Sequence, residues 1–233
     1  MESYDLIIKN AQIHTMDEDR KVYAKGIIGI EGEKITLIKE MNELTPEELQ
    51  ECEGAGRVID AEGKVVFPGF IDTHIHIFQS FLKGLGADHR LIEWLNLSAL
   101  PYGQYMTPHQ HELAAQLACM EAIKSGCTTM SEFFYTNQDS ELAHSCIEGM
   151  VSTGIRSVFI RTFQDTGEEY GMPKCFLEPV GKAMKEVDAL KKAYKENDML
   201  SIWTGPDVTW STTKEGYQEM LEYCLSENVR YSM

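Results

Sequence analysis

Residues 65–76 read VVFPGFIDTHIH, and this stretch decides how the rest of the chain is interpreted. Its second half, Phe70–His76, is short and apolar, which is typical of a strand. Alternate side chains of a strand point to the same face, so His74 and His76 would present two imidazoles side by side. Imidazole suits Zn²⁺ and Fe²⁺, and two neighbouring rings are close enough for one ion. Taken alone, the pair fits a metal site and a satisfied structural pair equally well.

Strand-like segments follow this stretch at intervals, and helical segments fill most of the gaps. The strand candidates begin near residues 70, 128, 155, 199 and 229, and helical patterns cover residues 107–126, 140–153, 178–197 and 213–227. Alternating strands and helices indicate a parallel sheet with right-handed crossovers, either a doubly wound sheet or a (β/α)₈ barrel. No G-x-G-x-x-G follows any of these strands, which disfavours a dinucleotide-binding sheet.

The first 65 residues have a different pattern, dominated by short β-rich runs. Gly26–Ile30 and Lys34–Ile38 flank the sequence Glu-Gly-Glu, which predicts a hairpin. Residues 42–56 carry five glutamates and no basic residue, so we expect a solvated loop or a short surface helix there. The sequence therefore predicts a small β module at residues 1–65 and an α/β domain at residues 66–233.

Composition narrows the class of partner. The chain has 233 residues, with 21 basic and 37 acidic side chains and a formal net charge of −16. Nucleic acids and anionic membranes bind to surfaces with clustered Lys and Arg, so we expect neither as a partner of this acidic chain. We find no secretory-signal pattern in residues 1–20, and no apolar run approaches the roughly 18 residues of a membrane span. The six cysteines are scattered without a C-x-x-C pair, which favours reduced thiols in a cytoplasmic protein.

Four further acidic and histidine residues receive structural interpretations. His109 and His111 repeat the His-x-His spacing, but on a helix their side chains diverge by roughly 200°, so we expect a surface pair rather than a metal site. Glu132 lies near the end of the strand that starts at residue 128, and a structural salt bridge is favoured there. Asp72 is expected to bond the backbone or to orient a neighbour.

The motif around the histidine pair resembles the opening of amidohydrolase-superfamily enzymes. The resemblance continues through Gln79, KGL at 83–85, Asp88, LIEWL at 91–95 and EAIKSGCTT at 121–129. The branch with the most similar motifs contains guanine deaminase, adenosylhomocysteine deaminase and the triazine hydrolases. The resemblance implies the (β/α)₈ barrel of a metal-dependent hydrolase, with a β-sandwich module contributed partly by residues 1–65.

The resemblance also implies a chemistry. His74 and His76 would be two ligands of one divalent metal ion, zinc rather than iron, which activates a water molecule. The reaction would be hydrolysis of a C–N bond, foremost deamination, on a purine, pterin or triazine. Gln79 would contact the ring, and Trp94 would lie on a loop over the pocket. Guanine deaminases carry an Arg-Phe pair after the fourth barrel strand. This chain has no such pair there, which argues against guanine as the substrate.

No catalytic residue of such an enzyme is expected within these 233 residues. The resemblance places a third histidine ligand, a proton-shuttling Glu, a further His and an Asp on later strands. We therefore expect that the chain holds about the first half of a barrel and is a fragment of a longer protein. Family members are commonly oligomers, so a homo-oligomer acting on a small heterocycle is expected.

Other interpretations remain open. The enzyme would be a dehalogenating triazine-type hydrolase, if the leaving group is a halide. Alternatively, the chain would be a non-catalytic half-barrel subunit that needs a partner chain, or one of two separate chains that together make an enzyme.

Overall fold

The computed structural model describes residues 4–233, which form two compact units. The first unit ends at Pro68 and the second begins at Gly69. None of the helices within the described residues is long and apolar enough to cross a membrane.

The first unit is a five-stranded sheet with one short helix. The predicted hairpin is present: β2 (Val22–Glu31) and β3 (Lys34–Glu40) pair antiparallel, and Gly32 turns between them at φ +57°. Helix α1 (Pro46–Glu53) lies in the glutamate-rich segment and buries only Cys52, as expected for a short surface helix. The sheet order is β3-β2-β1-β4, in which β1 (Leu6–His14) also pairs β5 (Val65–Val66) and β4 is Arg57–Asp60.

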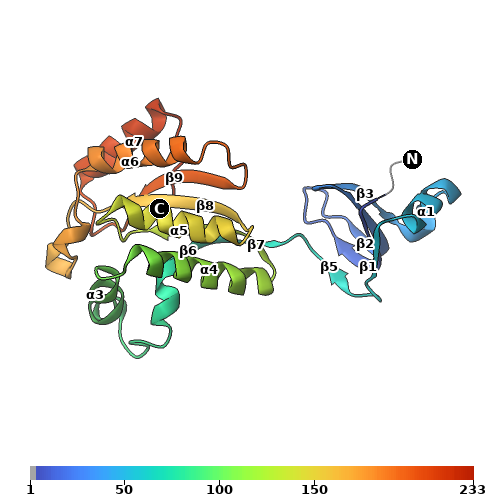
Figure 1. Ribbon diagram of the computed structural model, residues 1–233, viewed down its shortest axis with the longest axis horizontal. Helices are drawn as coiled ribbons and strands as arrows, with labels where there is room; N and C mark the ends of the chain where they lie inside the picture. Colours follow the sequence, from blue (N-terminus) through green and yellow to red (C-terminus); the bar gives the residue numbers. More distant parts are fainter. Residues whose placement is uncertain (1–3) are drawn as a thin grey trace. The chain divides into compact units, whose positions relative to one another are not determined.

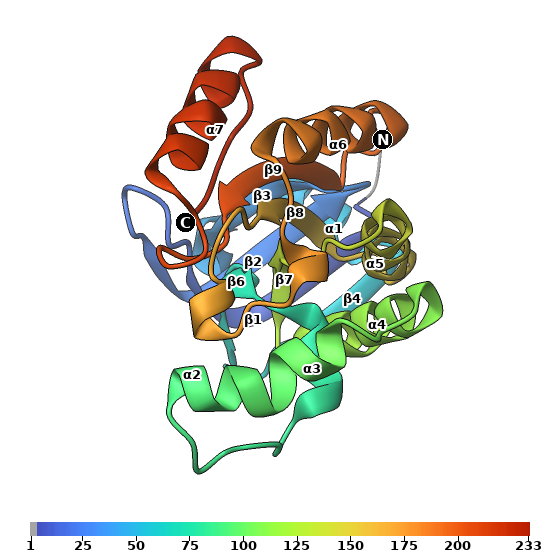
Figure 2. The ribbon, with the colours of Figure 1, turned by 90° about the vertical axis from the view of Figure 1, so that its left-hand side faces the viewer.

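The second unit is a parallel sheet whose helices follow one another around one face (Figures 1 and 2). Its strand order, β6-β7-β8-β9, is the order along the chain. The elements are β6 (Phe70–Ile75), β7 (Cys127–Phe134), β8 (Arg156–Phe163), β9 (Leu200–Pro206), α4 (Pro108–Lys124), α5 (Ser140–Ser152), α6 (Val180–Ala193) and α7 (Lys214–Ser226). The predicted alternation of parallel strands and helices is confirmed.

Short helices fill the long connection between β6 and α4. They are η2 (Ile77–Leu82), α2 (Leu91–Trp94), the π-helical η3 (Leu95–Ala99) and α3 (Leu100–Gly103). Their apolar residues form a small core with Tyr135, Met172 and Phe176. This core lies where the strands end, so the connection between β6 and α4 covers part of the carboxyl edge of the sheet.

Local sequence explains where the main helices begin. The Thr107 hydroxyl accepts a hydrogen bond from the Gln110 backbone amide, and the side-chain oxygen of Gln110 accepts one from the Thr107 backbone amide. Pro108 takes the first helical position of α4. Asp139 and Thr213 cap α5 and α7 with a side-chain oxygen alone, which accepts the backbone amide of Glu141 and of Gly216 respectively. Residues from β7 and β8 pack against α4 and α5 in the main core, which fixes these helices against one face of the sheet.

Two predictions about this unit are wrong in part. His109 is exposed, but His111 is fully buried, with its Nε2 3.4 Å from Thr136 Oγ1. The cause is the divergence of side chains two apart on a helix, which puts one of the two on the packed face of α4. Residues 229–233 form no full strand: Tyr231 makes a single parallel bridge to Thr204 in β9.

Candidate functional site

The two imidazoles of the motif meet at the carboxyl end of β6. His74 is in the strand and His76 is the first residue after it. Their Nε2 atoms lie 3.3 Å apart, and the ring planes are nearly perpendicular at 86°. Two imidazole nitrogens bound to one tetrahedral zinc ion at 2.0–2.1 Å would lie about 3.3 Å apart. The geometry of this pair therefore fits shared ligation of one ion.

Backbone contacts set the tautomer of His76. Its Nδ1 lies 2.8 Å from the carbonyl oxygen of Phe133. A carbonyl only accepts, so the proton is on Nδ1 and the lone pair is on Nε2, the atom that faces His74. Burial lowers the pKa of His76 to about 4, so the ring is neutral at pH 7. A neutral ring with an unprotonated Nε2 is the form that binds metals.

Neighbouring side chains fix the backbone on both sides of the pair. Asp72 Oδ1 accepts the His74 amide at 3.2 Å, which agrees with the expected backbone bond of Asp72. The Phe133 ring stacks on His74 with the centroids 4.5 Å apart. Glu132 Oε2 accepts the amide of Ile77 at 2.6 Å. Residues 132 and 133 of β7 thus hold the segment that carries both imidazoles.

The expected salt bridge of Glu132 is wrong. Glu132 is fully buried among the core residues of β7, α4 and α5, and no cation pairs with it among the described residues. Its Oε1 has no hydrogen-bond partner within residues 4–233, and burial raises its pKa to about 8. The side chain acts as a neutral acid that bonds the backbone after His76.

The two histidines supply only part of the ligands that a metal ion needs. Within residues 4–233, no group of three or more His, Cys, Asp or Glu side chains is placed to hold one metal ion. Catalytic zinc sites use three protein ligands and keep a position for water. A metal ion on His74 and His76 would therefore need at least one further ligand from outside the described residues.

A cavity of about 230 Å³ adjoins His76, and both residues predicted to contact substrate line it. The Gln79 amide nitrogen donates to the Tyr135 hydroxyl at 2.9 Å, which leaves its carbonyl oxygen for another partner. Trp94 donates through Nε1 to the Leu85 carbonyl, also at 2.9 Å, so its ring is held in place. Apart from His76, Gln79 and Asp207, the walls are apolar or aromatic: Leu91, Trp94, Leu95, Leu100, Tyr135, Met172, Val208 and Trp210.

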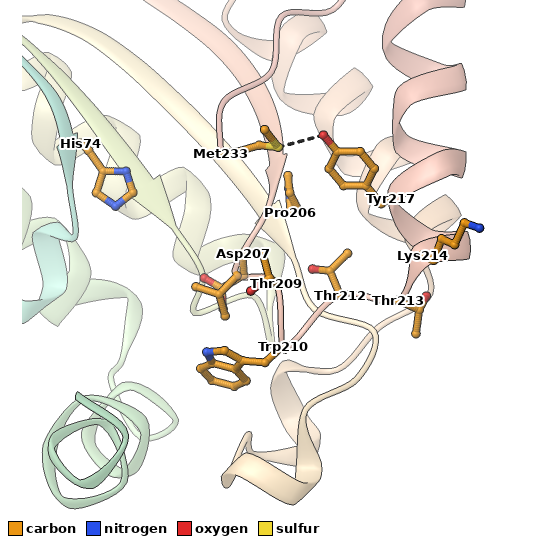
Figure 3. Close-up of a pocket in the computed structure, with 11 residues that line it drawn as sticks. His74, Pro206, Asp207, Thr209, Trp210, Thr212, Thr213, Lys214, Tyr217 and Met233 are labelled. Atoms are coloured by element: carbon orange, nitrogen blue, oxygen red, sulfur yellow. Dashed lines mark hydrogen bonds between the residues drawn. The ribbon is translucent and has the colours of Figure 1, made fainter. Parts of the chain in front are cut away.

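A larger cavity, of about 700 Å³, adjoins His74 (Figure 3). His74 lies on one side of this view, and the segment that follows β9 lies opposite. Asp207, Val208 and Trp210 line both cavities, so the two adjoin along this segment. Burial raises the pKa of Asp207 to about 6, against the opposing effect of hydrogen bonds from Gln164 and Ser211. At pH 7 the carboxyl is mostly ionised, and it faces both histidine cavities.

Comparison with known proteins identifies the family. The sequence profile of the amidohydrolase family matches residues 65–233. This chain belongs to the amidohydrolase family.

The amidohydrolase has relatives that are about twice as long. It is 28% identical over 220 residues to a 5-methylthioadenosine/S-adenosylhomocysteine deaminase of Bacillus cytotoxicus, covering 94% of this chain and 47% of the relative. It is 30% identical over 216 residues to the deaminase of the same name from Bacillus cereus, covering 92% and 45%. The chain thus spans about half the length of the curated relatives it matches.

Solved structures give the fold of this amidohydrolase. An atrazine chlorohydrolase from Arthrobacter aurescens, in a mutant complexed with zinc and atraton, matches with a TM-score of 0.80 at 22% identity, over 97% of this chain and 52% of that one. An adenosine deaminase from Xanthomonas campestris with bound zinc matches with a TM-score of 0.82 at 15% identity, over 99% and 49%. The predicted fold class, half of an amidohydrolase barrel with an N-terminal β module, is confirmed.

Sequence reasoning missed several cavity residues of this amidohydrolase. Tyr135 contacts both Gln79 and the His76 ring, whose centroid lies 4.9 Å from its own. It ends the aromatic run Phe133–Tyr135 at the carboxyl end of β7, a position from which a barrel residue reaches the site. Trp210 had no such signal, because it follows β9 in an irregular segment.

Proposed function

We propose that this chain carries part of the active site of a metal-dependent hydrolase that deaminates a nitrogen heterocycle. The observation that carries the proposal is the His74–His76 pair, whose Nε2 atoms are 3.3 Å apart while His76 Nδ1 is bonded to a backbone carbonyl. The names of the Bacillus relatives support deamination of a purine nucleoside derivative in this family. The second candidate within the same class is a hydrolase that displaces another leaving group, such as a halide, from a triazine.

In this proposal His74 and His76 hold one divalent ion, zinc in preference to iron. Such an ion supplies a Lewis acid that activates water near neutral pH. The Phe133 carbonyl keeps His76 in the tautomer that offers Nε2, and the Phe133 ring restricts the rotation of His74. The remaining ligand and the groups that transfer protons would come from outside the described residues.

The two cavities would hold the heterocycle beside the pair. Gln79 offers an amide oxygen to the ring, and its bond to Tyr135 fixes the amide orientation. Trp94, Tyr135 and Trp210 offer flat apolar surfaces that exclude water and pack against an aromatic substrate. The net charge of −16 supports a small molecule rather than a nucleic acid or an anionic membrane as the partner. A cytoplasmic homo-oligomer completes the proposal, and light scattering of the purified protein tests its oligomeric part.

The test uses the protein made from its complete coding sequence, stripped of metal and reloaded with zinc or cobalt. Metal content and affinity are measured for the wild type, His74→Ala, His76→Ala and the control His109→Ala, whose ring is exposed on α4. We expect one ion per chain and at least tenfold weaker binding in the first two variants, with the control unchanged. Ammonia release is then followed over a panel of amino-substituted purines, pterins and triazines.

Two results would overturn the proposal. Metal binding that is insensitive to both histidine substitutions would contradict the claim that His74 and His76 hold the metal ion. Metal-loaded protein that releases neither ammonia nor another leaving group from the panel would favour the non-catalytic interpretation.

A further inference from the structure

The end of β9 carries hydrogen-bond acceptors that the fold does not use fully. Asp207 follows β9 and lines both cavities beside the histidine pair. Its Oδ2 accepts one hydrogen bond, from the Ser211 hydroxyl at 3.2 Å. A carboxylate has about four acceptor positions, so Asp207 keeps capacity for a ligand even after the amide of Gln164 is counted.

Gln164 adds a second acceptor next to Asp207. Its amide nitrogen donates to the Tyr135 carbonyl at 3.1 Å, and because a carbonyl only accepts, this bond fixes which end of the amide is oxygen. The oxygen, Oε1, is buried and has no partner among the described residues. A buried acceptor without a donor costs free energy, so a water molecule that donates to it is favoured. Gln164 itself lines neither cavity and acts on a ligand only through Asp207.

Thr212 adds a hydroxyl group, which can either donate or accept a hydrogen bond. It lines the larger cavity together with Asp207, and its Oγ1 is buried without a hydrogen-bond partner in the part of the chain that the structure describes. Figure 3 places Thr212 and Asp207 in the same wall, on the opposite side from His74. No Lys or Arg forms an ion pair with Asp207 within residues 4–233. This wall carries the Asp207 carboxylate and the Thr212 hydroxyl, and Lys214, which also lines the cavity, forms no ion pair with Asp207.

We infer that Asp207 selects heterocycles that present adjacent N–H donors, such as a ring N–H beside an exocyclic amino group, over those that present a carbonyl at the same edge. A carboxylate accepts two parallel hydrogen bonds from such an N–C–N edge, as it does from a guanidinium group. A carbonyl oxygen in that place would meet the negative charge and leave the carboxylate unpaired. The aromatic walls of the smaller cavity cover the faces of the ring, so the edge alone distinguishes the two ligands.

This inference rests on the proposed function only in placing the ligand beside the histidine pair. The test is therefore a binding measurement on metal-free protein made from the complete coding sequence. The probes are 2-aminobenzimidazole, which has a donor edge, and benzimidazol-2-one, which replaces the amino group by a carbonyl. Quenching of tryptophan fluorescence, with Trp94 and Trp210 in the cavity walls, reports binding.

We expect the amino probe to bind the wild type at least tenfold more tightly than the oxo probe. Asp207→Asn should reduce that ratio to less than threefold, because the amide replaces one acceptor by a donor. Asp207→Glu keeps the charge and should keep a preference for the amino probe, as should Asp188→Asn, which removes one carboxylate from the exposed face of α6. Circular dichroism melting confirms that each variant is folded.

Equal binding of the two probes to the wild type would overturn the inference, and so would a preference that persists in Asp207→Asn. Either result leaves the proposed function standing if metal binding depends on His74 and His76 and ammonia is released. A wild type that binds no metal ion but still prefers the amino probe would overturn the proposed function and leave the inference about Asp207 standing.

Discussion

The side chain of Glu132 accepts the amide of Ile77 at 2.6 Å while its other oxygen is buried without a partner among the described residues. The carboxyl group lies inside an apolar core and is hydrogen-bonded to the backbone of the residue that follows His76. Burial raises its pKa from 4.5 to about 8, so the folded chain keeps it protonated where the unfolded chain ionises it.

This relationship predicts a stability that falls as the pH rises. Between pH 4.5 and about 8 the folded state binds one more proton than the unfolded state at Glu132, so unfolding becomes easier with rising pH. Glu132→Gln removes the ionisation and still accepts the Ile77 amide. We expect the variant to gain stability over the wild type progressively across this window, by up to several kcal/mol at about 1.4 kcal/mol per pKa unit. Urea unfolding at pH 5, 6.5 and 8 measures the difference, and a constant difference would contradict the account.

His111 predicts the opposite pH dependence. Burial lowers its pKa from 6.5 to about 4, so between these values the unfolded state binds the extra proton and stability falls as the pH falls. His111→Gln should lose less stability than the wild type between pH 6.5 and 4. The exposed neighbour makes His109→Gln a matched control, which should follow the wild type. Thermal melts at pH 4.5 and 7 decide this, and parallel losses in all three proteins would refute it.

The buried ion network around Arg161 in β8 predicts a large loss of stability when it is broken. Arg161 is fully buried and pairs with Glu178 and, at 2.5 Å, with Glu186. Glu178→Ala leaves the guanidinium short of one buried partner, so we expect a loss of about 3–5 kcal/mol in the free energy of unfolding. Asp19→Ala breaks the exposed pair with Lys21 and should cost less than about 1 kcal/mol. Denaturant titration of both variants tests the contrast, and similar losses would show that burial of the network is unimportant.

The bond between Gln79 and Tyr135 predicts coupled effects on substrate use. Gln79→Leu and Tyr135→Phe each break the 2.9 Å hydrogen bond that orients the amide. We expect each to lower kcat/KM about 10-fold or more, in line with a lost bond of about 1.5 kcal/mol, and the double variant to lose much less than the product of the two. The measurement is a double-mutant cycle with any amino-heterocycle of the panel from which the wild type releases ammonia. Fully multiplicative losses would mean that the two side chains act independently.

Much of the fold follows from patterns that are local in sequence. Thr107 and Pro108 mark the start of α4 because capping depends on residues three positions apart. The spacing of His74 and His76 places two rings on one face because strand geometry repeats every two residues. Neither inference requires knowledge of any other element.

The rest of the site depends on contacts between distant segments. Gln79 and Tyr135 are 56 positions apart, and no local pattern pairs them. Glu132 illustrates the same limit: charge alone favours a salt bridge, but the register of β6 and β7 places the carboxyl next to a backbone amide inside the core. The role inferred for Asp207 depends on two cavities that meet only after β9 is in the sheet.

The most direct measurement is a crystal structure of the zinc-loaded protein, made from its complete coding sequence, with anomalous data at the zinc edge. The account predicts one peak per chain within about 2.0–2.2 Å of Nε2 of both His74 and His76, with Nδ1 of His76 still on the Phe133 carbonyl. A peak at another site, or a peak bound by neither or only one of these imidazoles, would contradict the claim that the pair holds the metal ion.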